Sequence, residues 1–209
     1  MRTGRVQLRH KPLIKIWTRI FREAGISIPH RNIERLMHRT HIRRGPNDMR
    51  RIDITTAGID GVYGGSPLFM DVTIISPIHG TGLPMPRSAD HDGAANDRAE
   101  TRNRETDYPD VEASPHAQLL SLGVETYGRW SKHCLTLMRH LAKYKSKQVP
   151  VYLQRSTECA YFTRWWNLLS VTVQTIVATS IVRPSGTDLV GAADHLHVLP
   201  VEEILDLHR

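Results

Sequence analysis

The order of apolar and polar residues predicts a series of helices and strands along this chain. Apolar residues recur at helical spacing from Leu13 to Ala24, and Gly25 follows as a helix stop. Leu68–Ile75 is nearly continuous in apolar and β-branched residues, which is typical of a central strand covered on both faces. The remaining predicted elements are strands Arg51–Thr56 and Leu119–Tyr127 and helices Ala94–Tyr108, Trp130–Lys147 and Phe162–Ile181.

Helices and strands in this order predict an α/β fold, in which helices flank a mixed sheet and further helices follow at the C-terminus. We expect one structural domain with three parts. They are a basic N-terminal helix with its connecting segment over 1–50, an α/β core over 51–147 and a helical extension over 148–209. Ile26–Met37 is a further candidate strand, and Val201–Leu207 is a further candidate helix.

Asp71 lies inside the most apolar of the predicted strands. A buried carboxylate costs free energy unless it is paired or bound to a metal ion. Asp53 lies on the preceding predicted strand, 18 positions earlier, so adjacent strands can bring both carboxylates to one end of the sheet. Mg²⁺ prefers oxygen ligands, commonly one or two carboxylates with water and phosphate. The sequence therefore predicts that Asp53 and Asp71 bind Mg²⁺ or Mn²⁺.

Other charged residues are candidates to complete this site. Glu125, on the next predicted strand, is placed to be a third carboxylate ligand. Arg102 and Arg104, on the middle helix, could position a water molecule or stabilise phosphate charge. Simpler interpretations stay open for two of these residues. Glu125 could be a surface carboxylate that faces Arg129, and Arg104 could form an ordinary i,i+4 pair with Glu100.

The net charge of +7 is unevenly distributed along the sequence. Residues 1–51 contain 14 basic and 3 acidic residues, whereas residues 52–128 contain 4 basic and 12 acidic residues. An acidic middle with basic flanks suits a metal site set in a polyanion-binding surface. A solvated basic tail beside ordinary surface charge explains the same numbers equally well.

Several other classes of protein are disfavoured by the sequence. There is no Gly-x-Ser-x-Gly elbow for a serine hydrolase and no P-loop for a nucleotide-binding domain. The two cysteines do not form a zinc pattern, and no secretory signal is visible. The stretch between Arg164 and Arg183 lacks charge but carries many polar side chains, which favours a buried helix of a soluble protein over a membrane span. We expect a nuclear or cytoplasmic protein.

Together these residues resemble a known family. Arg51-Ile52-Asp53 and Met70-Asp71-Val72-Thr73 resemble the Arg-Pro-Asp and Asp-Val-Thr signature of restriction-like endonuclease domains. These PD-(D/E)XK-type nucleases lie at the C-terminal end of some non-LTR retrotransposon polyproteins. The remaining matches span roughly Arg9 to Val182. They are Arg9-His10, Glu23-Ala24-Gly25, a helix that ends at Tyr108, the run Gly123–Trp130, and Arg164-Trp165-Trp166.

The resemblance implies a restriction-endonuclease-like fold and a Mg²⁺-dependent (or Mn²⁺-dependent) nuclease that nicks DNA. Asp53 and Asp71 would bind the metal, and Glu125 would assist them. The expected partners are DNA, RNA of the parent element and the reverse transcriptase that the element encodes. The residues implied to contact the nucleic-acid backbone are Arg9, His10, Arg43, Arg44, Arg50 and Arg51.

The sequence departs from the family pattern at the middle helix. That helix follows Ala-x-x-x-Lys-x-x-Lys-Tyr in the family, and counting back from Tyr108 places the two lysines on Arg104 and Asp107. Arginine keeps the charge but cannot release a proton, so Arg104 is a weaker match for orienting water. The alternative functions are a catalytically inactive nucleic-acid-binding remnant and an interaction domain without a nucleic-acid role. We expect an Arg104→Lys change to separate a weakened nuclease from a remnant.

Overall fold

The computed structural model describes residues 3–28, 52–79, 81–85 and 93–182. By their contacts, the residues up to Val177 form one compact unit, and the packing described below lies within this unit. Most of the candidate strand Ile26–Met37 and the whole candidate helix Val201–Leu207 fall outside the described residues.

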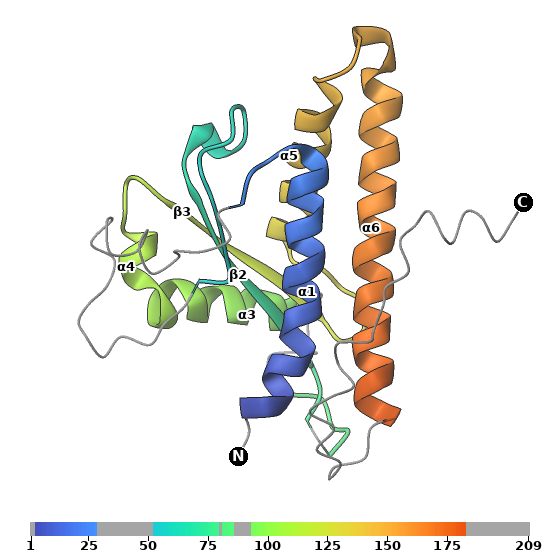
Figure 1. The fold of residues 1–209 in the computed structure, drawn as a ribbon. Coiled ribbons are helices and arrows are strands. Elements are labelled where there is room, and N and C mark those ends of the chain that lie inside the picture. The colour runs from blue at the N-terminus through green and yellow to red at the C-terminus, as the bar shows by residue number, and fades with distance from the viewer. Residues whose placement is uncertain (1–2, 29–51, 80, 86–92, 183–209) are drawn as a thin grey trace, which may run out of the picture. The chain divides into compact units, whose positions relative to one another are not determined.

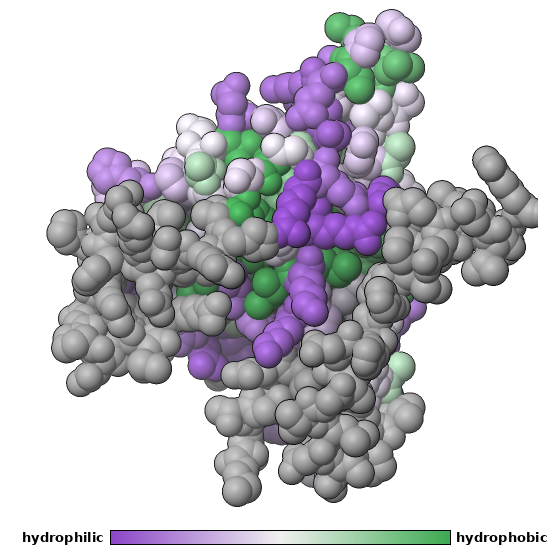
Figure 2. Space-filling view, viewed as in Figure 1, coloured by the Kyte–Doolittle hydropathy of each residue, from purple (hydrophilic) through white to green (hydrophobic). Residues whose placement is uncertain are grey.

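Helix α1 spans Thr3–Ala24 and begins ten residues before the predicted start. Its buried residues recur at helical spacing and include Leu13, Trp17 and Phe21. Gly25 ends the helix with φ of +89°, a left-handed conformation that glycine adopts without steric cost. Hydrophilic residues gather over α1 in the space-filling view (Figure 2). The helix is therefore amphipathic, as the pattern predicts.

Three strands form one mixed sheet in the order β1-β2-β3. Strand β1 (Ile54–Thr56) pairs antiparallel with β2 (Leu68–Ile75), and β2 pairs parallel with β3 (Gln118–Glu125). The prediction that β2 is the central strand is confirmed. The mixed α/β architecture is confirmed with it.

The two faces of the sheet differ in polarity because side chains alternate along each strand. One face carries apolar side chains such as Val72 and Leu122, which join a core cluster with residues of α1, α5 (Lys132–Ser146) and α6 (Val151–Val182). The opposite face carries Asp71 and Ser121, which are register partners. Helix α3 (Ala94–Arg102), the π-helical turn η2 (Asn103–Asp107) and helix α4 (Pro109–Glu112) lie in the crossover between β2 and β3. Helices α3 and α4 pack on the sheet (Figure 1).

Two predicted elements differ in extent from those observed. Strand β1 begins at Ile54, so Asp53 lies in a bend just before the strand and not within it. Helix α6 begins at Val151, eleven residues before its predicted start at Phe162. The first turn of α6 is exposed, and Val151 and Tyr152 each keep 82% of their surface accessible. A helix end with no buried face leaves no apolar periodicity for the sequence to reveal.

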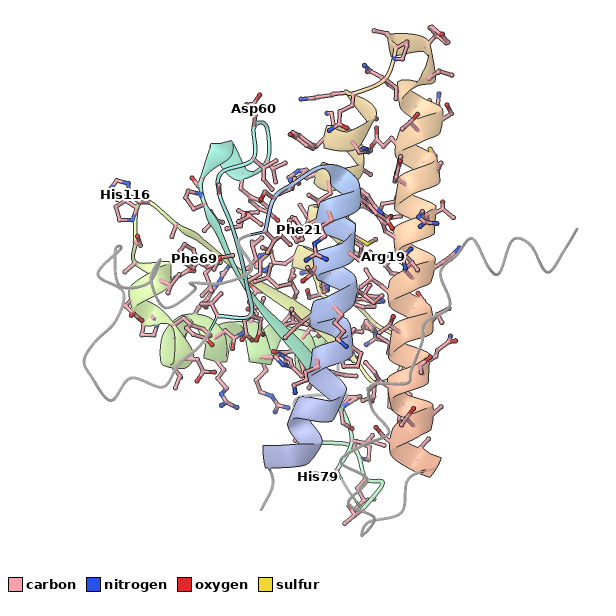
Figure 3. All side chains as sticks on the ribbon, in the orientation of Figure 1. Arg19, Phe21, Asp60, Phe69, His79 and His116 are labelled. Atoms are coloured by element: carbon pink, nitrogen blue, oxygen red, sulfur yellow. The ribbon has the colours of Figure 1, made fainter. Side chains whose placement is uncertain are left out.

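Glu23 joins the first and last described helices of this unit. Its carboxylate accepts hydrogen bonds from Arg164 at 3.1 Å and from Trp165 Nε1 at 2.8 Å, both on α6. Arg19 donates to the same carboxylate at 2.8 Å, one turn earlier on α1. In the stick view Arg19 lies between α1 and α6, while Phe21 belongs to the buried core (Figure 3). Within the described residues, no helix combines the length and apolar character needed to cross a membrane.

Candidate functional site

The carboxylate of Asp53, in the bend just before β1, lies near that of Asp71 on β2. Ile54 pairs with Met70, so extending this register by one residue sets Asp53 opposite Asp71. Residues directly opposite in an antiparallel pair lie close together on the same face. The backbone N–H of Val72 donates to Asp53 Oδ2 at 2.9 Å, which holds this carboxylate beside the strand position next to Asp71. The structure therefore brings together the two aspartates that the sequence singled out.

His10 is the third member of this group. Its Nε2 lies 2.8 Å from Asp53 Oδ2, although the two residues are 43 positions apart in the chain. The hydrogen bond to Asp53 raises the pKa of His10 above its ordinary value of 6.5, against the opposing effect of burial. The side chain of Asp53 is 11% exposed and that of His10 is 27% exposed, so solvent reaches the pair from the His10 side.

Asp71 is held by neutral donors. Thr73 Oγ1 donates to Asp71 Oδ2 at 2.8 Å, and Asn103 Nδ2 donates to the same oxygen at 2.9 Å. The Tyr108 hydroxyl faces Asp71 Oδ1 at 3.5 Å, a long contact. Burial and then the charge of Asp53 raise the pKa of Asp71, while the Thr73 and Asn103 hydrogen bonds lower it. The pKa of Asp71 is raised overall, so the hydrogen bonds from Thr73 and Asn103 do not fully offset the cost of burying its negative charge beside Asp53.

Asn103 is the helix residue that reaches the carboxylate. Its Nδ2 also donates to Ser121 Oγ at 3.0 Å, so both amide hydrogens have acceptors. The N–H of Tyr108 donates to the carbonyl of Asn103 at 2.7 Å, which closes a π turn. A π turn contains one more residue than an α-helical turn, and this brings Asn103 and Tyr108 to the same aspartate.

The extra residue in η2 shifts the helix by one position relative to a motif read at α-helical spacing. The family pattern counted back from Tyr108 assumes α-helical spacing and reaches Arg104. The same pattern counted forward from Ala99 reaches Asn103. The structure places Asn103, and not Arg104, against Asp71.

The two candidate arginines pair with acidic residues of the same crossover between β2 and β3. Arg104 lies 3.2 Å from Glu100 and 3.6 Å from Glu112. Arg102 lies 3.2 Å from Asp107. The structure therefore shows the i,i+4 pair that the sequence had left open for Arg104, and it does not bring either guanidinium to Asp71.

Glu125 lies on the same face of the sheet as Asp71 but farther along. Its partner on β2 is Ile75, whereas the partner of Asp71 is Ser121. Four residues of parallel strand separate the two positions by about 13 Å. Glu125 is buried, and Arg129 lies 3.8 Å from its carboxylate. The structure confirms the proximity of Glu125 to Arg129 and leaves Glu125 apart from the aspartate pair.

Gly123 and Asn96 set the distance between α3 and β3. A Cβ atom added at Gly123 would lie 2.8 Å from Asn96 Oδ1, closer than real contacts allow. Asn96 Nδ2 donates to the carbonyl of Arg129 at 3.2 Å, which anchors the first turn of α3. The missing side chain at Gly123 therefore lets α3 approach the polar face closely enough for Asn103 to reach Asp71.

Sequence reasoning missed several residues that surround the pair. Thr73, Asn103, Tyr108 and Ser121 contact Asp71 directly or through Asn103, and none of them was a candidate. A signal was present for Ser121, because it is a hydroxyl within the buried strand Leu119–Leu122. Local sequence carried no signal for the pairing of His10 with Asp53.

The donor set fits a hard divalent cation in part. Two carboxylates match the protein ligands that Mg²⁺ commonly uses with water and phosphate. The repulsion that Asp53 exerts on Asp71 is the kind of strain that a bound cation relieves. Within the described residues, no group of three or more histidine, cysteine, aspartate or glutamate side chains is arranged to hold a metal ion. A bound metal ion would therefore have the two aspartates as protein ligands, and water or phosphate would supply further ligands.

Most of the predicted nucleic-acid contacts lie outside the described residues. Arg43, Arg44, Arg50 and Arg51 belong to the undescribed segment 29–51, and the side chain of Arg9 is likewise undescribed. His10 is described, and its ring faces Asp53.

Comparison with known proteins adds no relative. No family model, no curated protein and no solved structure matches this chain.

Proposed function

We propose that this chain is a metal-dependent nuclease domain of the restriction-endonuclease-like class that cleaves phosphodiester bonds of DNA. The observation that carries the proposal is the proximity of Asp53, just before β1, to Asp71 on β2, where burial and then the charge of Asp53 raise the pKa of Asp71. A mixed sheet with helices on both faces supports it. Mg²⁺ or Mn²⁺, when bound, would neutralise phosphate charge and lower the pKa of a bound water.

Under this proposal the side chains of the site have distinct tasks. Asp53 and Asp71 would bind the cation, and the substrate phosphate would approach from the exposed side of His10. The Val72 N–H and His10 fix the carboxylate of Asp53, while Thr73 and Asn103 fix that of Asp71. Such supporting hydrogen bonds orient carboxylate ligands and hold them rigid.

The family resemblance seen in the sequence adds partners and a cellular location to the proposal. The domain would act with a reverse transcriptase and RNA of a retrotransposon, in the nucleus or cytoplasm. Arg9, Arg43, Arg44, Arg50 and Arg51 would contact the DNA backbone.

A catalytically inactive DNA-binding domain is the second candidate. The observation that favours it is the neutral Asn103 beside Asp71, where the family pattern counted from Ala99 has a lysine. An amide donates hydrogen bonds but supplies neither a positive charge nor a proton that it could release near neutral pH. Arg104 does not substitute for the lysine, since its guanidinium faces Glu100 and Glu112.

Nicking of supercoiled plasmid tests the proposed activity. The purified chain would be incubated with Mg²⁺ or Mn²⁺, beside Asp71→Ala and a matched Asp60→Ala variant. Asp60 is an exposed aspartate in the connection between β1 and β2 (Figure 3). We expect nicking by the wild type and by Asp60→Ala, and none by Asp71→Ala. Nicking that survives Asp71→Ala would refute the assigned site.

An Asn103→Lys variant separates the two candidates. A lysine at this position would place an ammonium group beside Asp71, whereas Arg104→Lys would leave the charge beside Glu100. A weakened nuclease should gain nicking from Asn103→Lys and not from Arg104→Lys. DNA binding without nicking in the wild type and both variants would favour the inactive domain.

A further inference from the structure

Helix α5 and the residue that caps its C-terminus carry a row of basic side chains on the outer face of the helix. Its buried residues include Leu137, Met138 and Leu141. Opposite them, exposed basic residues recur at intervals of seven, four and four positions, which keeps them on one side of the helix. We call this set the α5 stripe: Lys132, Arg139, Lys143 and Lys147.

The charges of the α5 stripe are not neutralised locally. The segment from Lys132 to Arg155 contains six basic residues and no acidic residue. Within the described part of the chain, none of the four stripe residues forms an ion pair. Basic residues elsewhere behave differently: Arg19 and Arg164 pair with Glu23, and Arg104 pairs with Glu100. The stripe is thus a surface of unbalanced positive charge.

The length of the stripe suits a rigid polyanion. Lys147 follows Lys132 by fifteen positions, or about 22 Å along the helix axis. Phosphates of one DNA strand rise by about 3.4 Å each, so the stripe spans about six base-pair steps. The stripe contains no aromatic residue on which unpaired bases could stack. Its helix already buries its apolar face in the core, which leaves no face for a lipid surface.

The start of the stripe is linked to the candidate site. Ser131 precedes Lys132 and caps α5, since its Oγ accepts a hydrogen bond from the N–H of Cys134. The same hydroxyl donates to the carbonyl of Ser121, and the Ser121 hydroxyl accepts from Asn103, which holds Asp71. The N-terminus of α5 is therefore hydrogen-bonded to the strand residue whose side chain supports the aspartate pair.

We propose that the α5 stripe binds the sugar–phosphate backbone of duplex DNA. The choice of DNA as the polyanion rests on the proposed nuclease function, whereas the positive surface itself does not. The four residues would contact phosphates without reading base sequence, so their contribution should depend on salt and be insensitive to sequence.

Binding of a labelled DNA duplex at several salt concentrations tests this proposal. The full chain would carry Asp71→Ala, without divalent metal, so that cleavage cannot interfere. In the stripe variant all four residues become glutamine, which preserves helix propensity. The control introduces the same change in net charge on the exposed face of α6, through Ala160→Glu, Thr163→Glu, Asn167→Glu and Gln174→Glu.

We expect the stripe variant to lower the slope of log affinity against log salt by about 3 to 4, at about 0.9 per phosphate contact. The α6 control should keep a slope close to that of the parent. Equal slopes for the two variants would overturn the proposal, as would a loss confined to single-stranded DNA. Binding to anionic phospholipid vesicles in place of the duplex would likewise overturn it.

The proposed DNA-binding surface and the proposed nuclease activity can be refuted independently of each other. If the parent chain binds duplex DNA through the stripe but the wild type never nicks plasmid, the surface assignment stands and the enzyme assignment falls. If plasmid is nicked in an Asp71-dependent way and the stripe variant binds DNA as tightly as its parent, the surface assignment alone falls.

Discussion

Asp71 combines the features that make a residue costly for stability and useful for function. It lies on the central strand, it is mostly buried, and the charge of Asp53 adds to the effect of burial in raising its pKa. Hydrogen bonds from Thr73 and Asn103 reduce the cost without removing it. A site with such unrelieved charge is typical of positions selected for binding and not for folding.

Asp71→Asn should therefore stabilise the fold and abolish metal-dependent activity. The new amide oxygen can accept from Thr73 and Asn103, while the new NH₂ group can face the Tyr108 oxygen, and the repulsion from Asp53 disappears. We expect a gain of about 1 kcal/mol in the free energy of unfolding. Urea denaturation at neutral pH in a chelating buffer measures it. A variant less stable than the wild type would contradict this account of Asp71.

The hydrogen bond between His10 and Asp53 predicts a pH-dependent contribution to stability. Because the pKa of His10 is raised in the folded state, the contribution is fully present below 6.5 and is lost as pH rises through the folded pKa. His10→Gln should cost about 1 kcal/mol at low pH, and less as pH rises above 6.5.

Urea denaturation of both proteins across this pH range, without divalent metal, checks the His10 prediction. Lys11→Gln is a suitable control because Lys11 is exposed on the same helix. A difference between wild type and His10→Gln that stays constant with pH would argue against a charged imidazole in the pair.

At the scale of elements, the crossover between β2 and β3 decides which side chains reach the site. The π turn η2 places Asn103 toward Asp71, and a residue inserted in a helix rotates those that follow by about 100°. The close approach of α3 to β3 depends on Gly123, whose backbone is that of an ordinary strand residue. The constraint at Gly123 is therefore one of space and not of backbone conformation.

Gly123→Ala should destabilise the protein by about 1 to 2 kcal/mol, because the added methyl group would press against Asn96 Oδ1. In an Asn96→Ala background the same change should cost much less, since the obstructing atom is gone. A double-mutant cycle by urea denaturation measures this coupling. Equal costs in both backgrounds would show that Gly123 does not set the distance between α3 and the sheet.

At the scale of the compact unit, one apolar core joins α1, α5, α6 and one face of the sheet. Glu23 adds a polar connection to this core, 141 residues from Arg164 in the chain. Burial tends to raise the pKa of Glu23, but hydrogen bonds from Arg164, Arg19 and Trp165 prevail and lower it to about 2. The contribution of Glu23 to the free energy of unfolding therefore decreases when acid protonates its carboxylate.

Glu23→Gln should lower stability by about 1 to 2 kcal/mol at neutral pH, since the bonds to charged partners are weakened. The folded pKa is depressed, so the contribution is present above 4.5 and is lost as pH falls toward about 2. The difference between wild type and variant should shrink over this range in denaturant titrations.

Glu158→Gln is the matched control, because Glu158 lies on α6 and forms no ion pair within the described residues. If the Glu23 and Glu158 variants respond alike to acid, the connection between α1 and α6 does not depend on the Glu23 charge.

The sequence by itself determined the type and order of the main elements, the central position of β2 and the prominence of Asp71. Each of these depends on a local pattern: apolar periodicity defines helices and strands, and a carboxylate in an apolar run is conspicuous wherever the run folds. The sequence also indicated Asp53. The segment Arg51–Thr56 is the predicted strand just before β2, so it was the first candidate to pair with β2 and to bring a second carboxylate near Asp71.

Only the tertiary structure decided what surrounds the aspartates. His10 reaches Asp53 because α1 packs on the apolar face of the sheet, and Asn103 replaces Arg104 because of one extra residue in a turn. Glu125 lies four strand positions from the level of Asp71 because of the register of two parallel strands. Pairing register, turn type and helix packing arise from contacts between distant segments, so no local pattern of residues records them.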